Sequence, residues 1–210
     1  MGKVMTELSM SLDGYIAGPH DGPDNPLGDG GTALFRWYQS GDTPFIVPSG
    51  TMTFRVSAAS AALLEEMYPR IGALVTGRRT FDITNGWEGR HPSDVPIVVV
   101  THEAPEAWVQ EYVTGRGAPF TFVTEGVARA VEVAGRIAGD QDVAVAAASL
   151  VQQCLRLGLL DEIQIDLAPV LLGGGVRLFD GIGDAAIGLE RLRVVEGRDV
   201  THLLFRVLKA

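Results

Sequence analysis

Short apolar segments that alternate with helix-forming segments are the feature that most constrains how this chain can fold. Residues 95–101 read VPIVVVT and carry no polar face. A strand that is apolar on both faces is typical of a parallel sheet covered by helices on both sides. Further strand patterns occur at residues 3–12, 71–76, 120–124, 142–146 and 161–172.

Helical patterns separate these strands at residues 57–68, 126–139 and 149–158, and another helix starts after residue 77. In the first, we expect Ser57 to cap the helix and Leu63, Leu64 and Met67 to face inward. Residues 189–197 and 200–208 predict a closing hairpin. The whole pattern predicts an α/β fold with a mostly parallel sheet, flanking helices and an antiparallel C-terminal edge.

Size, charge and cysteine content narrow the class of protein. A chain of 210 residues is long enough for one large core, so we predict a single domain over residues 1–210. The formal net charge of −9 disfavours nucleic acid and anionic membranes as main partners. The lone Cys154 cannot form an internal disulfide, and no apolar run reaches the roughly 18 residues of a membrane span. We expect a cytoplasmic protein that binds a small molecule and no metal.

Three strand-to-helix junctions are candidates for binding an anion, because parallel sheets bind ligands at the carboxyl ends of their strands. The first is VTGRRTF at residues 75–81, where Arg78 and Arg79 fall in the first helical turn. Cations are disfavoured there unless an anion binds. The alternative is that both guanidinium groups are solvated or paired with surface acids.

The second junction holds Thr101 and His102, and the third runs from strand 142–146 into helix 149–158. This third turn carries Ala146, Ala147 and Ala148 where a phosphate-binding turn usually has glycine. A long loop, residues 18–31, is rich in Gly, Pro, Asp and Asn and is a candidate binding loop. These features predict a phosphorylated or dinucleotide ligand and do not specify a reaction.

The order of motifs identifies a family resemblance. MSLDGYIAG, GRRTFD, VPIVVVTHEAP and GLLDEIQIDLAPVLLGGGVRLF together resemble the dihydrofolate-reductase-like proteins. The chain is most similar to the C-terminal reductase domain of the bifunctional riboflavin-biosynthesis enzyme. The resemblance implies an eight-stranded sheet, hydride transfer from NADPH, often a dimer, and for this branch a phosphoribosylamino-pyrimidine substrate.

The resemblance also implies roles for individual residues. The residues that would hold the NADPH phosphates are Gly77, Arg78, Arg79 and Thr80. Thr101 and His102 would lie near the 2′-phosphate of the adenosine ribose. The pyrophosphate turn would be Ala146, Ala147, Ala148, Ser149 and Leu150, and the nicotinamide would lie against Ser9, Ile16 and Ala17. Leu34 and Trp37 would face the substrate, with Asp13 near the hinge of the first loop.

Two departures from the family pattern bear on function. Alanine replaces the family's consecutive glycines at Ala146 and Ala147, which leaves the N–H donors but adds methyl groups where pyrophosphate would approach. Dihydrofolate reductases place a carboxylate at the start of the first helix. The matching position in this chain is near Thr32, which has no carboxylate, and this disfavours folate reduction. We therefore predict an NADPH-dependent reductase of a small heterocyclic substrate. The first alternative is a non-catalytic binding protein that keeps the fold but has lost affinity for the cofactor. A flavin- or pterin-binding stress protein is the second alternative.

A different carboxylate is the candidate acid. In EIQIDLAP, Ile163 and Ile165 alternate with Gln164 and Asp166, so the polar pair should face the substrate side of the sheet. We predict Asp166 as the catalytic acid, because burial tends to raise the pKa of a carboxyl group and so suits it to donate a proton. Gln164, on the same face, is predicted to contact the substrate. The alternative is a carboxylate paired with arginine or with backbone N–H groups. The apolar LAPVLLGG segment predicts a homodimer.

Overall fold

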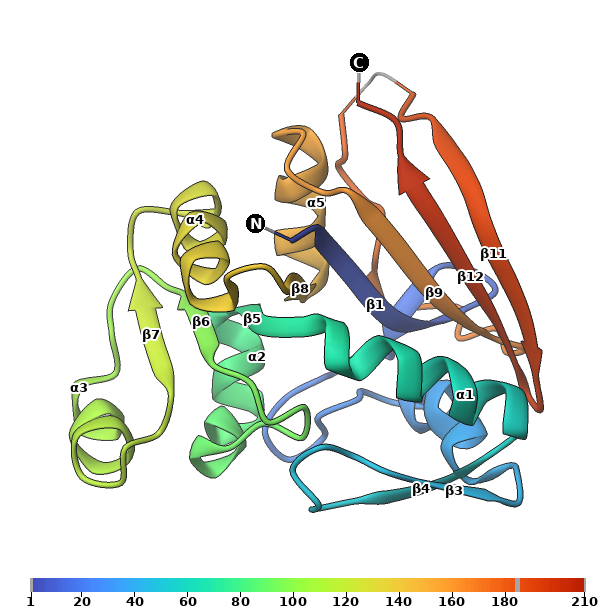
Figure 1. Cartoon of the computed structure of the whole chain (residues 1–210), viewed down its shortest axis with the longest axis horizontal. Coiled ribbons are helices and arrows are strands. Elements are labelled where there is room, and N and C mark those ends of the chain that lie inside the picture. The colour runs from blue at the N-terminus through green and yellow to red at the C-terminus, as the bar shows by residue number, and fades with distance from the viewer. Residues whose placement is uncertain (1, 184–185, 210) are drawn as a thin grey trace.

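A central sheet organises the molecule. The computed structural model describes residues 2–183 and 186–209, and within them eight strands pair in the order β11-β12-β9-β1-β8-β5-β6-β7 (Figure 1). The pairings from β9 to β7 are parallel, whereas β12 pairs antiparallel with β9 and with β11. The predicted mostly parallel sheet with an antiparallel C-terminal edge is confirmed.

The strands of this sheet fall close to the predicted segments. They are β1 (Val4–Ser11), β5 (Ile71–Gly77), β6 (Ile97–Val100), β7 (Phe120–Val123), β8 (Asp142–Ala146), β9 (Glu162–Ala168), β11 (Leu189–Gly197) and β12 (Val200–Val207). The ninth strand is shorter than predicted, because after Ala168 the chain leaves the sheet for the Gly-rich turn.

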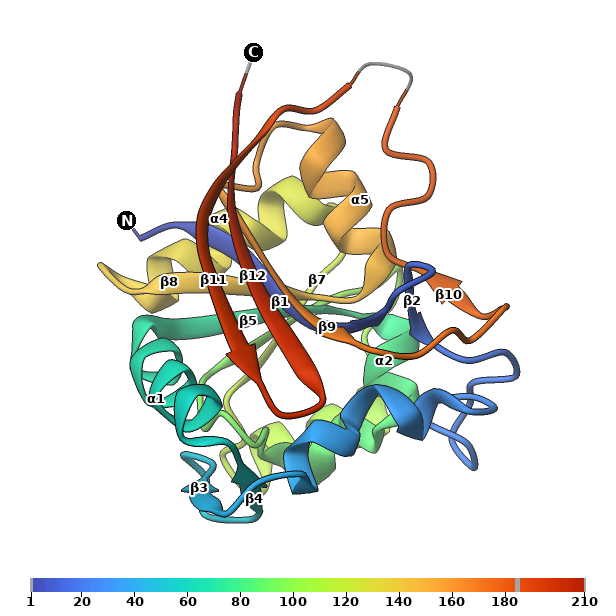
Figure 2. The ribbon, with the colours of Figure 1, turned by 90° about the vertical axis from the view of Figure 1, so that its right-hand side faces the viewer.

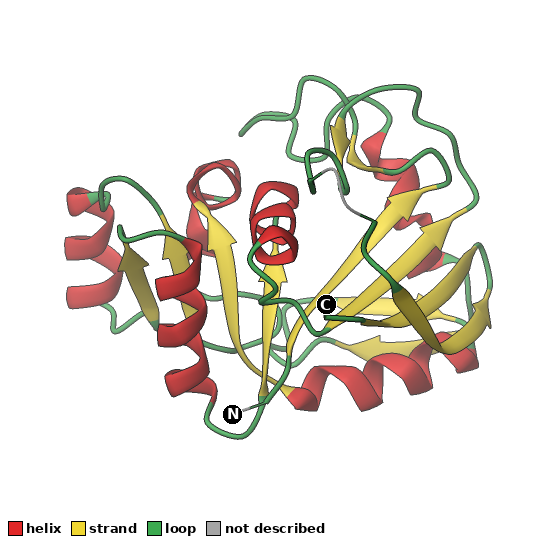
Figure 3. Ribbon diagram, turned by 90° about the horizontal axis from the view of Figure 1, so that it is seen from above, coloured by secondary structure: helices red, strands yellow, loops and turns green. Residues whose placement is uncertain are grey.

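Helices cover both faces of the sheet, as Figures 1 and 3 show. On one face lie α4 (Val127–Ala138) and α5 (Ala148–Arg156), which pack with Ile163 and Ile165 into the largest apolar cluster. On the other lie α1 (Ala58–Met67) and α2 (Arg78–Ile83). Ser57 caps α1 as predicted, since its Oγ accepts a hydrogen bond of 3.1 Å from the Ser60 N–H.

Smaller elements complete this second face and were not predicted. A 3-10 helix, η1 (Gly31–Gln39), and a hairpin of β3 (Thr43–Ile46) and β4 (Thr53–Val56) pack with α1 around Trp37. The remaining elements are η2 (Tyr68–Arg70), η3 (Asn85–Gly89), α3 (Glu106–Trp108), the π-helix η4 (Val109–Thr114), and the pair β2 (Tyr15–Ala17) and β10 (Val176–Arg177) (Figure 2).

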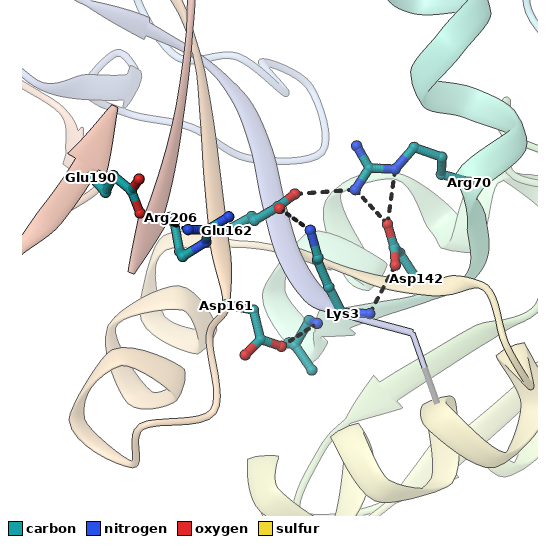
Figure 4. Close-up of polar contacts among 8 residues, drawn as sticks. Lys3, Arg70, Asp142, Asp161, Glu162, Glu190 and Arg206 are labelled. Atoms are coloured by element: carbon teal, nitrogen blue, oxygen red, sulfur yellow. Dashed lines mark hydrogen bonds and ion pairs between the residues drawn. The ribbon is translucent and has the colours of Figure 1, made fainter. Parts of the chain in front are cut away.

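A network of charged side chains ties the amino ends of four sheet strands together (Figure 4). Arg70, just before β5, donates to Asp142 of β8 at 2.7 Å and to Glu162 of β9 at 3.1 Å. Lys3, before β1, pairs with Glu162, and its backbone N–H donates to Asp142 at 2.8 Å. The network lies at the edge opposite the strand carboxyl ends. None of the described helices is long and apolar enough to cross a membrane.

Candidate functional site

A groove runs along the carboxyl ends of β5, β6 and β8, which are neighbours in the sheet. Its cavity measures about 660 Å³. The three predicted junctions meet here, because each follows one of these strands. Of the residues predicted for the cofactor, the structure brings these to the groove: Ile16, Ala17, Gly77, Arg78, Arg79, Thr80, Thr101, His102, Ala146, Ala147, Ala148, Ser149 and Leu150. Ser9 lies elsewhere, in the cavity described below.

Both arginines of the first junction are paired with acids. Arg79 donates to Asp21, whose carboxylate lies in the long first loop, at 2.8 Å and 3.0 Å. Arg78 donates to Asp82 one turn along α2 at 2.7 Å and to the Glu103 carbonyl at 2.9 Å. The alternative prediction, that these arginines pair with surface acids, therefore describes both of them in this structure. Because both guanidinium groups remain partly exposed at the groove, an anion can still reach them.

The alanine turn has a backbone suited to glycine. Ala147 lies at φ 122° and ψ 132°, a region that L-residues rarely adopt. This conformation starts α5, and no side chain caps the helix. The Leu150 N–H of the first turn donates to the Ala147 carbonyl at 3.1 Å, and the N–H groups of Ala148 and Ser149 are left for a ligand, as at many phosphate sites.

A second, smaller cavity of about 270 Å³ adjoins the groove. The two cavities share Leu8 of β1, Ile16 of β2 and Ala146 at the end of β8. Aromatic and apolar side chains dominate the smaller cavity, and its polar side chains are few. Its other lining residues are Glu7, Ser9, Phe35, Tyr38, Met52, Phe54, Met67, Tyr68, Ile71, Leu74, His91, Pro92, Ser93, Ala144 and Val145.

The residues predicted from the resemblance to face the substrate do not line this cavity. Leu34 and Trp37 are fully buried, because η1 repeats every three residues and turns both toward the core. Phe35 and Tyr38, one position further, line the cavity instead. The Trp37 indole reaches it only indirectly, since its Nε1 donates to Ser9 Oγ at 3.1 Å.

Asp13 also lies outside both cavities. Its carboxylate accepts hydrogen bonds from Ser11 Oγ and from the backbone N–H groups of Leu172 and Gly173, which follow β9. These bonds, that from Ser11 first, lower the pKa of Asp13 to about 2. The residue joins the end of β1 to the glycine turn rather than contacting the cavity.

Gln164 and Asp166 face the same side of the sheet as the cavity, as the alternation predicted, but they lie behind its wall. Both are buried, and neither lines it. Asp166 Oδ1 accepts from His202 Nδ1 at 2.7 Å and from Gln164 Nε2 at 3.3 Å. The sequence left open that Asp166 pairs with an arginine or with backbone N–H groups. In the structure its side-chain partner is instead the imidazole of His202 in β12, together with the Gln164 amide.

The carboxyl group that does face the cavity is Glu7 of β1. In the sheet register Glu7 pairs with Gln164 and Ser9 with Asp166, so Glu7 and Asp166 are diagonal neighbours on one face. Burial raises the pKa of Glu7 well above its usual value, and the charge and contact of Asp166 raise it further. Burial also raises the pKa of Asp166, although contacts with Glu7 and Gln164 oppose this.

His202 completes the cluster on the far side of Asp166. Its Nε2 lies 2.8 Å from Ser60 Oγ, which in turn accepts from Ser57 Oγ at 3.0 Å. Burial lowers the pKa of His202 to about 4. A neutral imidazole that donates through Nδ1 to Asp166 and accepts at Nε2 from Ser60 satisfies every contact.

Comparison with known proteins agrees with this architecture. The family of RibD C-terminal domains matches residues 2–203. The chain belongs to this family. A search among curated proteins finds no match.

Solved structures of riboflavin-biosynthesis proteins share this fold. A candidate riboflavin-biosynthesis protein from Shewanella sp. PV-4 is 21% identical, with a TM-score of 0.66 and full coverage of both chains. RibD of Acinetobacter baumannii is 16% identical, with a TM-score of 0.62; the match covers 100% of this chain and 59% of that one. The riboflavin biosynthesis reductase Rib7 of Saccharomyces cerevisiae is 10% identical, with a TM-score of 0.59 over 99% of this chain and 90% of that one.

Two cavity residues that sequence reasoning missed had different signals. Glu7 alternates with Ser9 and Ser11 on one face of β1, and this period of two was visible in the sequence. Its significance depends on β1 lying beside β9, which no local pattern shows. His91 comes from the connection before β6, where no regular period points a side chain toward a cavity.

Proposed function

We propose that this protein is an NADPH-dependent reductase of a small heterocyclic substrate. The observation that carries the proposal is the pair of adjoining cavities, a long groove with cationic groups at one end and a compact aromatic pocket at the other. Hydride transfer needs two ligands whose reacting atoms meet, and the shared residues Leu8, Ile16 and Ala146 mark where they would meet.

The groove residues fit a dinucleotide phosphate. Arg78, Arg79 and His102 supply positive or donor groups for the adenosine end, and the uncapped first turn of α5 supplies N–H groups for the pyrophosphate. Leu8, Ile16 and Val176 form an apolar inner end that would pack on the nicotinamide and exclude water. When bound, NADPH would supply a hydride to the substrate in the smaller cavity.

Calorimetry with NADPH and NADH tests cofactor binding. We expect NADPH to bind more tightly, and Arg79→Met to weaken NADPH about tenfold with little effect on NADH, because one charge-assisted bond contributes roughly 1.5–3 kcal/mol. Arg136→Met is the matched control, since Arg136 is an exposed arginine of α4 that pairs with Glu132. Equal affinities for both cofactors would remove the 2′-phosphate assignment.

A non-catalytic binding protein is the second candidate. The Ala147 methyl group in the turn and the Asp21 carboxylate on Arg79 both favour it, since each opposes an approaching phosphate. Absence of binding to either cofactor at millimolar concentration would support this candidate and exclude the reductase.

A further inference from the structure

Two carboxyl groups lie in contact at the smaller cavity, on the neighbouring strands β1 and β9. Glu7 faces the cavity, and Asp166 lies directly behind it with no exposed surface. We propose that Glu7 donates the proton in the reduction, and that the substrate is a phosphate-free nitrogen heterocycle with a ring nitrogen against the Glu7 carboxyl group. The inference rests on the proposed reductase function and specifies its substrate class.

The hydrogen bonds of Asp166 indicate where the proton lies. Its Oδ1 already accepts from His202 and Gln164, which favours the anionic form of this residue. Its Oδ2 is buried and has no hydrogen-bond partner among the donor groups of the described residues. Glu7 contacts Asp166, and a proton on Glu7 gives Oδ2 the donor that it lacks.

Electrostatics lead to the same assignment. Ionisation of both carboxyl groups of a pair in contact is strongly disfavoured, because Asp166 is buried and Glu7 is half-buried, so the resting pair keeps one proton and a net charge of −1. The titratable groups that face Glu7 are Asp166 of β9, His202 of β12, Tyr38 of η1 and Tyr68 of η2. Burial raises the pKa of both tyrosines, and His202 is neutral, so none of these groups supplies a compensating cation.

The rest of the cavity wall defines the substrate. Phe35, Tyr38, Phe54 and Tyr68 suit a planar ring, and Tyr38 stacks on Phe54 with ring centroids 3.9 Å apart. None of the described lining residues is a lysine or an arginine. Burial lowers the pKa of the one lining histidine, His91, to about 4, so it is neutral at pH 7. A phosphate group would therefore meet a carboxyl pair of net charge −1 with no cation to offset it.

The chemistry balances with NADPH as the reductant. The carbon of a ring C=N bond would gain the hydride from NADPH, and the nitrogen of the same bond would gain the proton from Glu7, giving CH–NH and NADP⁺. Glu7 is left ionised and regains a proton from water through the cavity opening once product leaves. Asp166 does not touch the substrate; it is a positioning residue that keeps the Glu7 carboxyl protonated before the reaction.

Infrared spectroscopy of the protein without ligands tests the shared proton. We expect the C=O band of a protonated carboxyl group at pH 7 in the wild type and no such band in Glu7→Gln. In Asp166→Asn the negative neighbour of Glu7 is gone, so Glu7 should lose its proton, and the band should vanish, at a lower pH than in the wild type as the pH is raised. Glu162→Gln is the matched control: it removes another buried carboxyl, one that Lys3 and Arg70 hold, and should leave the band in place. A wild-type spectrum without the band, or a Glu7→Gln spectrum that keeps it, would overturn the proton assignment.

A matched pair of ligands tests the substrate class. With NADPH present, we expect 5-amino-6-ribosylaminouracil to bind at least tenfold more tightly than its 5′-phosphate. For any heterocycle that is reduced, Glu7→Gln should lower kcat by about 10²–10⁴ with little change in KM. Tighter binding of the phosphate would overturn the substrate class. Failure of NADPH itself to bind would instead exclude the reductase, while the infrared result would still stand.

Discussion

At the scale of single residues, Ala147 is the clearest local conflict between side chain and backbone. Its φ of 122° costs an L-residue roughly 1–3 kcal/mol, and glycine at this position would not carry that cost. Glycine would instead lose more conformational freedom on folding, which costs about 0.5–1 kcal/mol. We expect Ala147→Gly to raise the free energy of unfolding by about 1 kcal/mol and to tighten NADPH binding, measured by urea denaturation and calorimetry.

The neighbouring alanine supplies the control for this substitution. Ala146 ends strand β8 and is not among the residues with positive φ. Glycine there relieves no strain and adds only flexibility, so Ala146→Gly should lower the free energy of unfolding by about 0.5–1 kcal/mol. Equal effects of the two substitutions would mean that the turn is not strained in solution.

The sequence correctly predicted the direction of a side chain where the periodicity of a single strand or helix determines it. The alternation of β9 placed Gln164 and Asp166 on the face opposite Ile163 and Ile165, and the structure confirms this. Which acid meets the cavity depends on a neighbouring strand, so Glu7 could not be found in the same way. The cofactor and substrate roles of individual residues remain predictions until a ligand is bound.

At the scale of elements, strands and long helices were predictable and short irregular elements were not. α4 repeats its apolar residues at helical spacing over 12 residues, which gives a strong signal. The 3-10 helix η1 has a period of three, and β3 and β4 are four residues each, too short for either period to emerge. η1 and β4 supply three aromatic side chains of the smaller cavity, Phe35, Tyr38 and Phe54, which is why this part of its lining could not be predicted.

The network at the amino ends of the strands predicts a stability effect that is separate from function. Arg70→Met leaves buried Asp142 without its guanidinium partner and Glu162 with Lys3 alone. Loss of one partner of a buried pair costs roughly 3–5 kcal/mol; we expect about 2–3 kcal/mol here, because Arg70 is partly exposed. Arg206→Met, which breaks an exposed pair with Glu190, should cost less than about 1 kcal/mol.

Urea denaturation measures both substitutions, and the NADPH affinity is the second readout. Because the network lies at the sheet edge opposite the groove, neither variant should change the dissociation constant of the cofactor. Equal losses of stability for the two variants would show that the buried position of Asp142 and Glu162 carries no extra energetic weight.

At the scale of the whole molecule, the homodimer remains a prediction. Leu12 and Leu171 are 65% and 69% exposed, and the hydrogen bond from the Leu12 N–H to the Val170 carbonyl brings their segments together. Exposed apolar side chains that cluster in this way are common at interfaces between copies. We expect light scattering at micromolar concentration to give twice 22.4 kDa, and Leu171→Asp to give 22.4 kDa. A monomer in the unmodified protein would contradict the prediction.

The pH dependence of unfolding is also a property of the whole molecule, and His91 isolates one contribution to it. Burial lowers the pKa of His91 to about 4, whereas the unfolded residue titrates near 6.5. As the pH falls from about 6.5 to about 4, the unfolded chain binds a proton that the folded chain excludes. The folded state therefore loses up to about 3 kcal/mol from this residue.

His91→Asn measures this contribution directly. Nδ1 of His91 accepts from the Ser93 N–H at 3.1 Å and lies 2.6 Å from Ser93 Oγ, and asparagine keeps an acceptor at a similar position. The raised pKa of Glu7 acts in the opposite direction, since protonation of Glu7 at lower pH favours the folded state, but this effect is common to both proteins and cancels in their difference. We expect the two proteins to differ little near pH 7 and the wild type to become up to about 3 kcal/mol less stable than the variant by pH 4. A difference that does not change with pH would show that His91 titrates in the folded protein as it does in the unfolded chain, and that the cavity wall at this position is open to water.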